Sequence, residues 1–232
     1  MAKLPTVEQM KFRRYPPLKS GPPILWTAGR YFRRNEGTTD YAQFAAPIVL
    51  VDDFKIHFQA MMQVDATGIF LGSSVDNNDY FGYLTGGRLR LRFDGNTLDT
   101  PAASFPANRL AGGVIERVLG VISISVGGSV VASVSNTAPF KFDTLYRNFD
   151  GNNLSGILAN LEAWDNGVLV TDCPIDESSG ATIFDTVGGN NATIINGLDA
   201  DRGKFIEQPT LWKGENLTAP PWDSVDQELL KS

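Results

Sequence analysis

Carboxylates and histidines are the first side chains to consider, because most hydrolytic centres are built from them. Hydrolysis of a glycosidic bond with retention needs two carboxylates about 5–5.5 Å apart. Asp52 and Asp53 are neighbours in the sequence and would point to opposite faces of an extended chain. His57 is the only histidine, and no Gly-x-Ser-x-Gly motif accompanies it. These residues predict no catalytic site, and we expect His57 to have a structural or surface role.

Metal-binding residues are also few. Cys173 is the single cysteine, which excludes an internal disulfide and a cysteine-cluster metal site, and beside Pro174 it is expected to pack as a small hydrophobe. Residues 76–79 (Asp-Asn-Asn-Asp) and 150–153 (Asp-Gly-Asn-Asn) supply oxygens of the kind that calcium prefers. The same residues form good turns, and neither loop matches the EF-hand pattern. We therefore expect turns without a metal or cofactor, with calcium as the lesser alternative.

One alternating run of arginines is a candidate ligand face. Arg88, Arg90 and Arg92 are separated by apolar residues, so a strand would project all three from one side. Such a face could bind acidic sugars or an acidic protein surface. The alternative is a solvated edge strand, on which positive charge blocks unwanted pairing. The sequence leaves both interpretations open.

The first 36 residues form a basic segment ahead of an acidic body. They carry eight basic and two acidic side chains, a net charge of +6, whereas the other 196 residues carry 12 basic and 24 acidic ones, a net charge of −12. Tyr15-Pro16-Pro17 and Gly21-Pro22-Pro23 impose an extended conformation. The side chains expected to bind a partner are Phe12, Arg13, Arg14, Tyr15, Trp26, Tyr31, Phe32 and Arg33. We expect residues 1–40 to be an arm that becomes ordered against an acidic surface, and the charge of the body argues against nucleic acid.

From residue 41 the sequence is typical of short strands separated by turns. In residues 55–64 one face holds Ile56, Phe58 and Ala60 while the other is mostly polar. Similar patterns predict strands at residues 68–72, 79–84, 88–93, 121–126, 130–134, 140–143, 157–163 and 168–170. Residues 111–119 are ambiguous. The spacing predicts an all-β fold over residues 41–215, an antiparallel two-sheet sandwich of the jelly-roll type.

The remaining features concern the tail and the location. Residues 216–232 are predicted to be a tail with a short helix, because Ser224 and Gln227 form a capping pattern. No apolar run approaches the roughly 20 residues that cross a bilayer, and the N-terminus shows no secretory signal. We expect a protein made in a cytoplasm, without membrane insertion.

One segment resembles a known family. Residues 174–194 read Pro-Ile-Asp-Glu-Ser-Ser-Gly-Ala-Thr-Ile-Phe-Asp-Thr-Val-Gly-Gly-Asn-Asn-Ala-Thr-Ile. This is similar to the D-E-x-S-G-x-T-x-x-D-x-x-G-x-x-N-x-T-I segment of concanavalin-A-like, laminin-G-like jelly-roll domains. The hairpin 122–134 and residues 154–164 also resemble strands of that family. The resemblance covers residues 40–215 and implies two packed, curved sheets.

The resemblance also guides the functional hypotheses. Enzymes of the family place their carboxylates as Glu-x-Asp-x-x-Glu, and the nearest approach, residues 162–165 (Glu-Ala-Trp-Asp), breaks that spacing. Relatives are common in structural proteins of tailed phages and in bacterial surface proteins. The leading hypothesis is a non-enzymatic structural component of a phage virion, at the capsid surface or the tail, which binds copies of itself and other virion proteins. The alternatives are a carbohydrate-binding adhesin or receptor-binding module that takes surface glycans, and a glycan hydrolase of the same fold.

Overall fold

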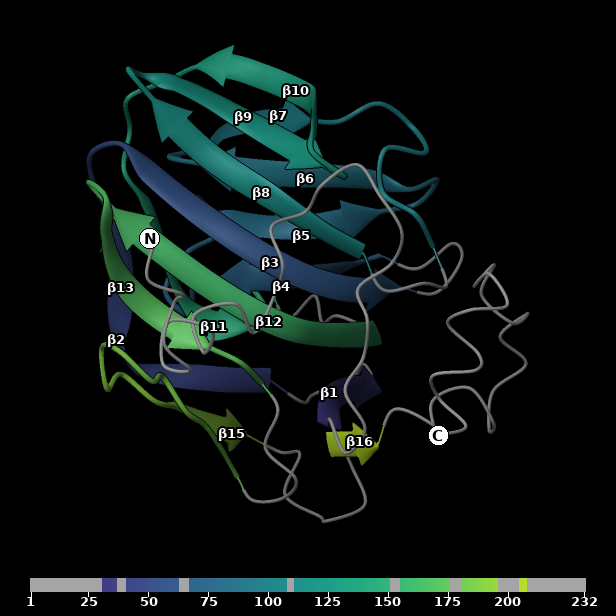
Figure 1. The fold of residues 1–232 in the computed structure, drawn as a ribbon, viewed down its shortest axis with the longest axis vertical. Helices are drawn as coiled ribbons and strands as arrows, with labels where there is room; N and C mark the ends of the chain where they lie inside the picture. Colours follow the sequence, from purple (N-terminus) through teal and green to yellow (C-terminus); the bar gives the residue numbers. More distant parts are fainter. Residues whose placement is uncertain are drawn as a thin grey trace, which may run out of the picture.

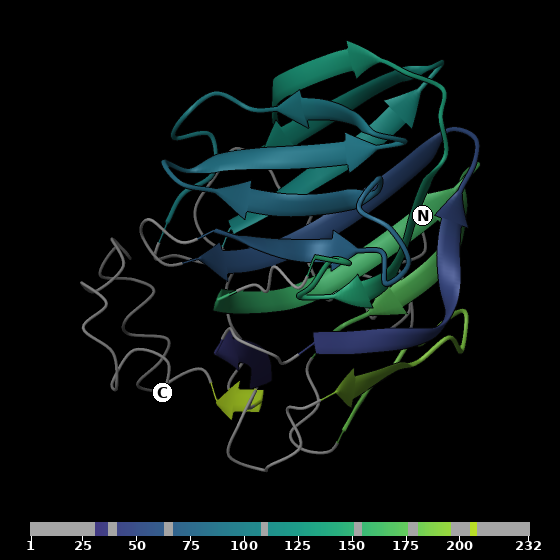
Figure 2. The same cartoon turned by 180° about the vertical axis from the view of Figure 1, so that it is seen from behind.

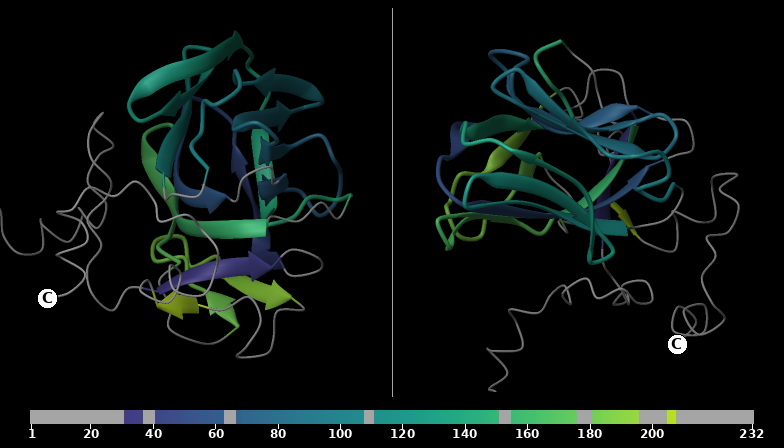
Figure 3. Two further views of the ribbon diagram at one scale, coloured as in Figure 1. Left: turned by 90° about the vertical axis from the view of Figure 1, so that its right-hand side faces the viewer. Right: turned by 90° about the horizontal axis from the view of Figure 1, so that it is seen from above.

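A computed structural model shows two antiparallel β-sheets packed face to face (Figures 1 and 3). It describes residues 31–36, 41–62, 67–107, 111–150, 155–175, 181–195 and 205–207. Within these ranges the regular elements are strands, and none is a helix long and apolar enough to cross a membrane. The predicted all-β, two-sheet sandwich is therefore confirmed.

The sheet that faces the viewer in Figure 1, here called the front sheet, has eight strands. Its strands in spatial order are β10 (Ser129–Ser135), β9 (Val121–Val126), β8 (Ala111–Val118), β3 (Phe54–Met62), β12 (Ser155–Asp165), β1 (Tyr31–Glu36) and β16 (Phe205–Glu207). The eighth strand, β13 (Val168–Cys173), pairs with the second half of β12, whose first half pairs with β1. Because β12 is long, its edge opposite β3 pairs with both β1 and β13.

The other sheet, here called the back sheet, also has eight strands and is seen from outside in Figure 2. Its strands in spatial order are β14 (Thr182–Ile183), β15 (Ala192–Ile195), β2 (Tyr41–Leu50), β11 (Phe140–Leu145), β4 (Gly68–Gly72), β5 (Tyr80–Leu84), β6 (Arg88–Phe93) and β7 (Asn96–Asp99). β14 and β15 come from the segment that resembles the jelly-roll family, and they extend this sheet through β2.

The core lies between the two sheets, because alternation sends every second side chain inward. In β3, Ile56 and Phe58 are at most 1% exposed, while His57 between them faces outward, as predicted. Phe58 lies edge to face against Phe81 of β5, with ring centroids 4.8 Å apart, and so joins the front sheet to the back sheet. Cys173 is buried in this core, as expected for a small hydrophobe.

The strand predictions are largely confirmed. Every strand expected between residues 55 and 170 is present, and the ambiguous residues 111–119 contain β8. The sequence analysis did not predict β1, β2, β7, β14, β15 and β16. The helix expected in residues 216–232 lies outside the described residues.

The expected arm, residues 1–40, overlaps the front sheet. Residues 31–36 form β1, whose backbone pairs with β12 and β16 of the same chain. Three residues predicted to bind a partner, Tyr31, Phe32 and Arg33, thus lie in a strand of their own domain. The other predicted arm residues, Phe12, Arg13, Arg14, Tyr15 and Trp26, lie outside the described residues.

Candidate functional site

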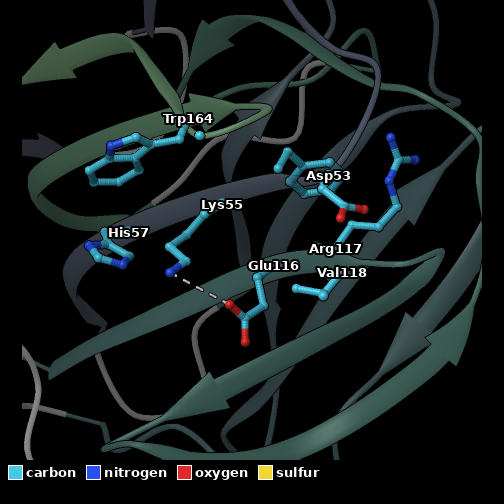
Figure 4. A pocket seen from close by; sticks show the side chains of 9 residues that line it. Asp53, Lys55, His57, Glu116, Arg117, Val118 and Trp164 are labelled. Carbon is cyan, nitrogen blue, oxygen red and sulfur yellow. Dashed lines mark ion pairs between the residues drawn. The ribbon is translucent and has the colours of Figure 1, made fainter.

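An open pocket lies on the outer face of the front sheet, over β3, β8 and β12 (Figure 4). Its volume is about 470 Å³. Its lining residues come from these strands and from the turns at their ends: Asp53, Phe54, Lys55, His57, Glu116, Arg117, Val118, Trp164 and Gly167. Sheet pairing therefore assembles the pocket from three segments that are far apart in the sequence.

The strand register places the polar side chains of the pocket next to one another. Lys55 of β3 pairs with Glu116 of β8 on one side and with Trp164 of β12 on the other. Two residues further along β3, His57 pairs with Glu162 of β12. Because alternate residues of a strand share a face, these five side chains all point away from the core.

The pocket combines an aromatic pair with the carboxylate of Glu116, and the carboxylate of Glu162 lies beside the lining residue His57; each of the two carboxylates has a basic neighbour. The rings of His57 and Trp164 have centroids 4.7 Å apart and planes inclined by 60°. Lys55 Nζ lies 3.8 Å from Glu116 Oε2, and His57 Nδ1 lies 3.6 Å from Glu162 Oε2. The exposed fractions of these four polar side chains lie between 22% and 46%. A ligand could therefore reach each of them from solvent.

A buried arginine fixes one end of the pocket. Arg117 is 3% exposed, and its guanidinium donates to the carbonyl of Asp52 (2.7 Å from Nε) and to that of Ala138 (2.5 Å from Nη1). Further donation from Nη2 reaches the carbonyls of Val51 and Asp52. Arg117 therefore joins the turn before β3 to the segment before β11, and its donors are used within the fold.

A second polar pair continues the same sheet face beyond His57 and Glu162. Gln59 of β3 and Asn160 of β12 are paired in register, and they are 3% and 2% exposed. Their side-chain carbonyl oxygens are buried without a hydrogen-bond donor. The amide of Asn160 donates to Glu162 Oε1 at 3.4 Å. A buried acceptor without a donor costs about 1–3 kcal/mol, so this pair is an unfavourable polar feature beside the pocket.

This arrangement can hold a ring that has one apolar face and many hydroxyl groups. The aromatic rings of Trp164 and His57 offer apolar area to C–H groups. The carboxylates of Glu116 and Glu162 accept hydrogen bonds from hydroxyls, and the Lys55 ammonium donates them. A few polar groups converging beside an aromatic surface are typical of small-molecule sites.

The sequence analysis did not identify this pocket. His57 was expected to have a structural or surface role, and Glu162 and Trp164 were considered only for a spacing that enzymes need. The usable signal was the polar and aromatic side chains at outward positions of the strands predicted at residues 55–64 and 157–163. The strand register, which brings them together, was not available from the pattern alone.

The arginines predicted as a ligand face lie together on the outer side of β6 in the back sheet. Arg90 donates from two nitrogens to the two carboxylate oxygens of Asp99 in β7, both at 2.7 Å. This pairing raises the pKa of Arg90 and lowers that of Asp99. Arg88 donates only to the carbonyl of Thr85, at 3.4 Å, and Arg92 Nε is buried without an acceptor. Asp99 thus holds Arg90 in an ion pair, whereas Arg88 and Arg92 form none among the described residues, and the face stays a candidate.

Of the two loops considered for calcium, the structure describes residues 76–79 and Asp150, whereas residues 151–153 lie outside the described residues. Asn77 donates to the carboxylate of Asp150. Lys141 Nζ lies 3.2 Å from Asp76 Oδ2 and 4.0 Å from Asp79 Oδ2. Its ammonium group thus occupies the position that a bound cation would take between these carboxylates. The backbone N–H of Asn78 and then Lys141 lower the pKa of Asp76, whereas burial raises that of Asp79. Among the described residues, no three acidic, His or Cys side chains are grouped to bind a metal. The absence of calcium stays a prediction.

The segment that resembles the jelly-roll family is organised around one carboxylate. Asp185 is 5% exposed. It accepts hydrogen bonds from four backbone N–H groups, those of Asp172 (3.0 Å), Val187 (3.2 Å), Gly188 (3.1 Å) and Asn190 (3.2 Å). The hydroxyl of Thr171 also donates to it, at 3.1 Å. Burial by itself would raise the pKa of Asp185, but these hydrogen bonds outweigh it and lower the pKa.

The glycine and asparagines of this segment also have structural roles. A Cβ at Gly188 would lie 2.5 Å from Asp185 Oδ2, so a side chain does not fit there. Asn191 Oδ1 accepts the N–H of Asp185 at 2.9 Å. Asn190 exchanges two hydrogen bonds with the backbone of Ala46 in β2, at 2.9 and 2.8 Å. Asp185, Gly188 and Asn191 of the D-x-x-G-x-x-N pattern therefore close the turn between β14 and β15, and the adjacent Asn190 attaches it to β2.

Sequence comparisons find no relatives for this chain. No protein-family model matches it, and no curated protein matches it in sequence.

Solved structures resemble the chain at low sequence identity. A candidate carbohydrate-binding protein of Bacteroides ovatus has a TM-score of 0.55 and 14% identity, over 71% of this chain and 58% of that chain. Domains LG4-5 of the mouse laminin alpha1 chain (TM-score 0.44) and the enzymatically active domain of bacteriophage CBA120 tailspike protein 2 (0.43) are each 13% identical over 63% of this chain, and cover 45% and 30% of their own lengths. This chain spans less than two thirds of each of these proteins. Its fold is that of the concanavalin-A-like, laminin-G-like β-sandwich domains, as the resemblance of residues 174–194 implied.

Proposed function

We propose that the chain is a carbohydrate-binding module that holds a sugar in the pocket over β3, β8 and β12 without hydrolysing it. The observation that carries the proposal is the part-exposed His57–Trp164 ring pair, flanked by Lys55, Glu116 and Glu162. The fold is shared with solved structures that include a candidate carbohydrate-binding protein. That likeness only makes a sugar the first ligand to test, and the proposal itself rests on the pocket.

The charges of the pocket favour a neutral sugar. Lys55 and Glu116 form an ion pair, and among the described residues the basic neighbour of Glu162 is the His57 ring. Asp53 adds a further carboxylate to the lining, and Arg117 has its donors engaged by backbone carbonyls. With Glu162 beside the lining, three carboxylates thus lie near the two cations Lys55 and Arg117. An acidic sugar would be repelled, whereas hydroxyl groups can donate to the carboxylates.

The positions of the two carboxylates do not suit hydrolysis with retention. Glu116 and Glu162 lie on β8 and β12, with β3 between them. Neighbouring strands lie about 4.8 Å apart, so these two backbones are roughly 10 Å apart. Lys55 and His57 project between the two glutamates. Retention needs carboxyl groups about 5–5.5 Å apart with the scissile bond between them, and two basic side chains occupy the corresponding space here.

A glycan array followed by titration of the best neutral ligand tests this function. We expect Trp164→Ala to weaken binding at least tenfold, because the indole supplies much of the apolar area. Thr97→Ala, an exposed position on β7 of the back sheet, is the matched control and should bind as the wild type does. No binding to any glycan, or equal binding by Trp164→Ala, would contradict the proposal. Release of reducing ends that is lost in Glu162→Gln would instead show a hydrolase.

A structural role in a phage virion is a second proposal, and a different observation supports it. Residues 1–36 carry a net charge of +6 against −12 for the rest of the chain. Opposite charges of this size attract an arm to the acidic body of a neighbouring copy or to another virion protein. The two roles are compatible, since a module that binds surface glycans can also be carried by a particle. The truncations described in the Discussion test this role.

A further inference from the structure

Most free edges of the two sheets are short, charged or covered. β7, at the end of the back sheet, has four residues, and its Asp99 is ion-paired with Arg90. β14 and β16 have two and three residues. β13 is covered in part, because the carbonyl of Asp172 accepts the N–H of Thr186 at 2.8 Å. Natural sheets protect their edges in these ways against pairing with other chains.

β10 is the exception among the described strands. It has seven residues, Ser-Val-Val-Ala-Ser-Val-Ser, with no charged residue and no proline. It ends the front sheet at the top of Figure 1, and its other edge pairs with no strand in the part of the chain that the structure describes. Val130 is 63% exposed and Val134 is 37% exposed. The one irregularity is a bulge between Val130 and Ala132, which leaves residues 132–135 in regular pairing with β9.

We propose that two copies of the chain pair antiparallel along β10, so that their front sheets join into one. When a strand pairs with its own copy about a two-fold axis, each of its residues lies opposite a residue of the same strand sequence. Serine, valine and alanine place no like charges opposite each other there, unlike Asp99 of β7. The pairing satisfies the unpaired backbone groups of the edge and covers the exposed valines. A second copy would therefore meet no repelling charge along this edge.

The joined sheet would also place two pockets on one face. From β3 of one copy to β3 of the other there are seven strand intervals, through β8, β9 and β10 of each copy. At about 4.8 Å per interval, the two pockets lie roughly 34 Å apart along the sheet. Two sites at a fixed distance on one face bind a glycan-covered surface with higher avidity than one site does. This consequence rests on the proposed function, whereas the dimer itself does not.

Sedimentation velocity of the full chain between about 1 and 100 μM tests the dimer. We expect a mass of twice 25.2 kDa for the wild type. The double substitution Ser133→Lys with Ser135→Lys should give the monomer mass, because positive charges would meet across the two-fold axis. Thr97→Lys, which adds the same kind of charge to the β7 edge, is the control and should stay dimeric. Circular dichroism and the melting temperature establish that each variant is folded.

The outcomes separate this inference from the proposed function. A wild type that stays monomeric at 100 μM, or a folded lysine variant that stays dimeric, overturns the dimer. With a soluble monovalent sugar, the lysine variant should bind as the wild type does. On a surface that carries many copies of the sugar, the same variant should bind at least tenfold more weakly. A dimer that binds no sugar would leave the pairing of β10 intact and remove only the functional proposal.

Discussion

At the scale of single residues, Asp185 shows how one carboxylate can organise a turn without a basic partner. Its two oxygens accept four backbone N–H groups and one hydroxyl. The negative charge is thereby stabilised by donors that come from β13 and from the turn itself. The close approach of Gly188 to this carboxylate explains why a glycine follows three residues later. The family pattern in this segment is therefore explained by folding, and it carries no information on a ligand.

Replacement of this carboxylate should lower the stability of the fold and change how that stability depends on pH. Asp185→Asn turns one acceptor oxygen into a donor that faces other donors, so we expect a loss of about 2–3 kcal/mol at neutral pH. The melting temperature should fall by roughly 5–10 °C. Val187→Ala, an exposed neighbour, is the control and should change little.

The pH dependence follows from the lowered pKa of Asp185. A carboxyl with a lowered folded-state pKa contributes its stabilisation above its ordinary value of 3.8 and loses it as pH falls through the lower value. The melting temperature of the wild type should thus drop in this acid range more steeply than that of Asp185→Asn. Equal curves for the two proteins would show that the carboxylate does not stabilise the fold.

At the scale of elements, the sequence was most informative where hydrophobic alternation is strict. β3, β6 and β9 alternate over most of their length, and they were predicted close to their observed bounds. β14 and β15 are two and four residues long, and side-chain hydrogen bonds from their connecting turn attach them to the sheet. Alternation cannot identify such short strands. β1 lies in a basic segment that follows two proline pairs, and this composition led to the prediction of an extended arm instead of a strand.

The pocket could not be predicted for a related reason. The sequence pattern of each pocket strand indicates only that one face of the strand is exposed to solvent. The register between β3, β8 and β12 decides that Lys55, Glu116 and Trp164 lie in one row across the sheet. Register depends on long-range packing, which a pattern along one segment does not contain. The same holds for Lys141, which lies against Asp76 although the two are distant in sequence.

Two truncations test β1 and the arm separately. Removal of residues 1–30 keeps β1, whereas removal of residues 1–36 also removes a strand that pairs with β12 and β16. We expect the longer deletion to melt several degrees lower than the shorter one, because about 1 kcal/mol corresponds to roughly 2–4 °C in a chain of this size. Equal melting temperatures would contradict a stabilising role for β1.

The shorter deletion also tests the proposed virion role, through the size of the assembly. If the basic arm joins copies beyond the dimer, the protein without residues 1–30 should lose every assembly larger than the dimer. Trp26→Ala in the full chain should weaken such assembly more than Arg14→Ala, because a buried aromatic usually contributes more than a rim charge. Assembly that survives the deletion unchanged would remove the support for this role.

At the scale of the whole molecule, the two sheets present different outer faces. The front sheet carries the pocket, with its aromatic pair and the carboxylates of Asp53 and Glu116 (Figure 4). The back sheet, whose outer side faces the viewer in Figure 2, includes β6 with its arginines. The front face suits a neutral sugar, and the back face is the remaining candidate for an acidic ligand. The edge at β10 adjoins the front face, so pairing there would leave both pockets open.

Mapping the bound sugar onto the two faces tests the central claim most directly. The measurement is the change in backbone amide chemical shifts of the full chain when the neutral glycan that binds best is added. We expect changes concentrated on β3, β8 and β12 around His57, Glu116 and Trp164, with the amides of β5, β6 and β7 unchanged. Changes centred on Arg88 and Arg92 of β6, or saturating binding that leaves the pocket amides unshifted, would contradict it.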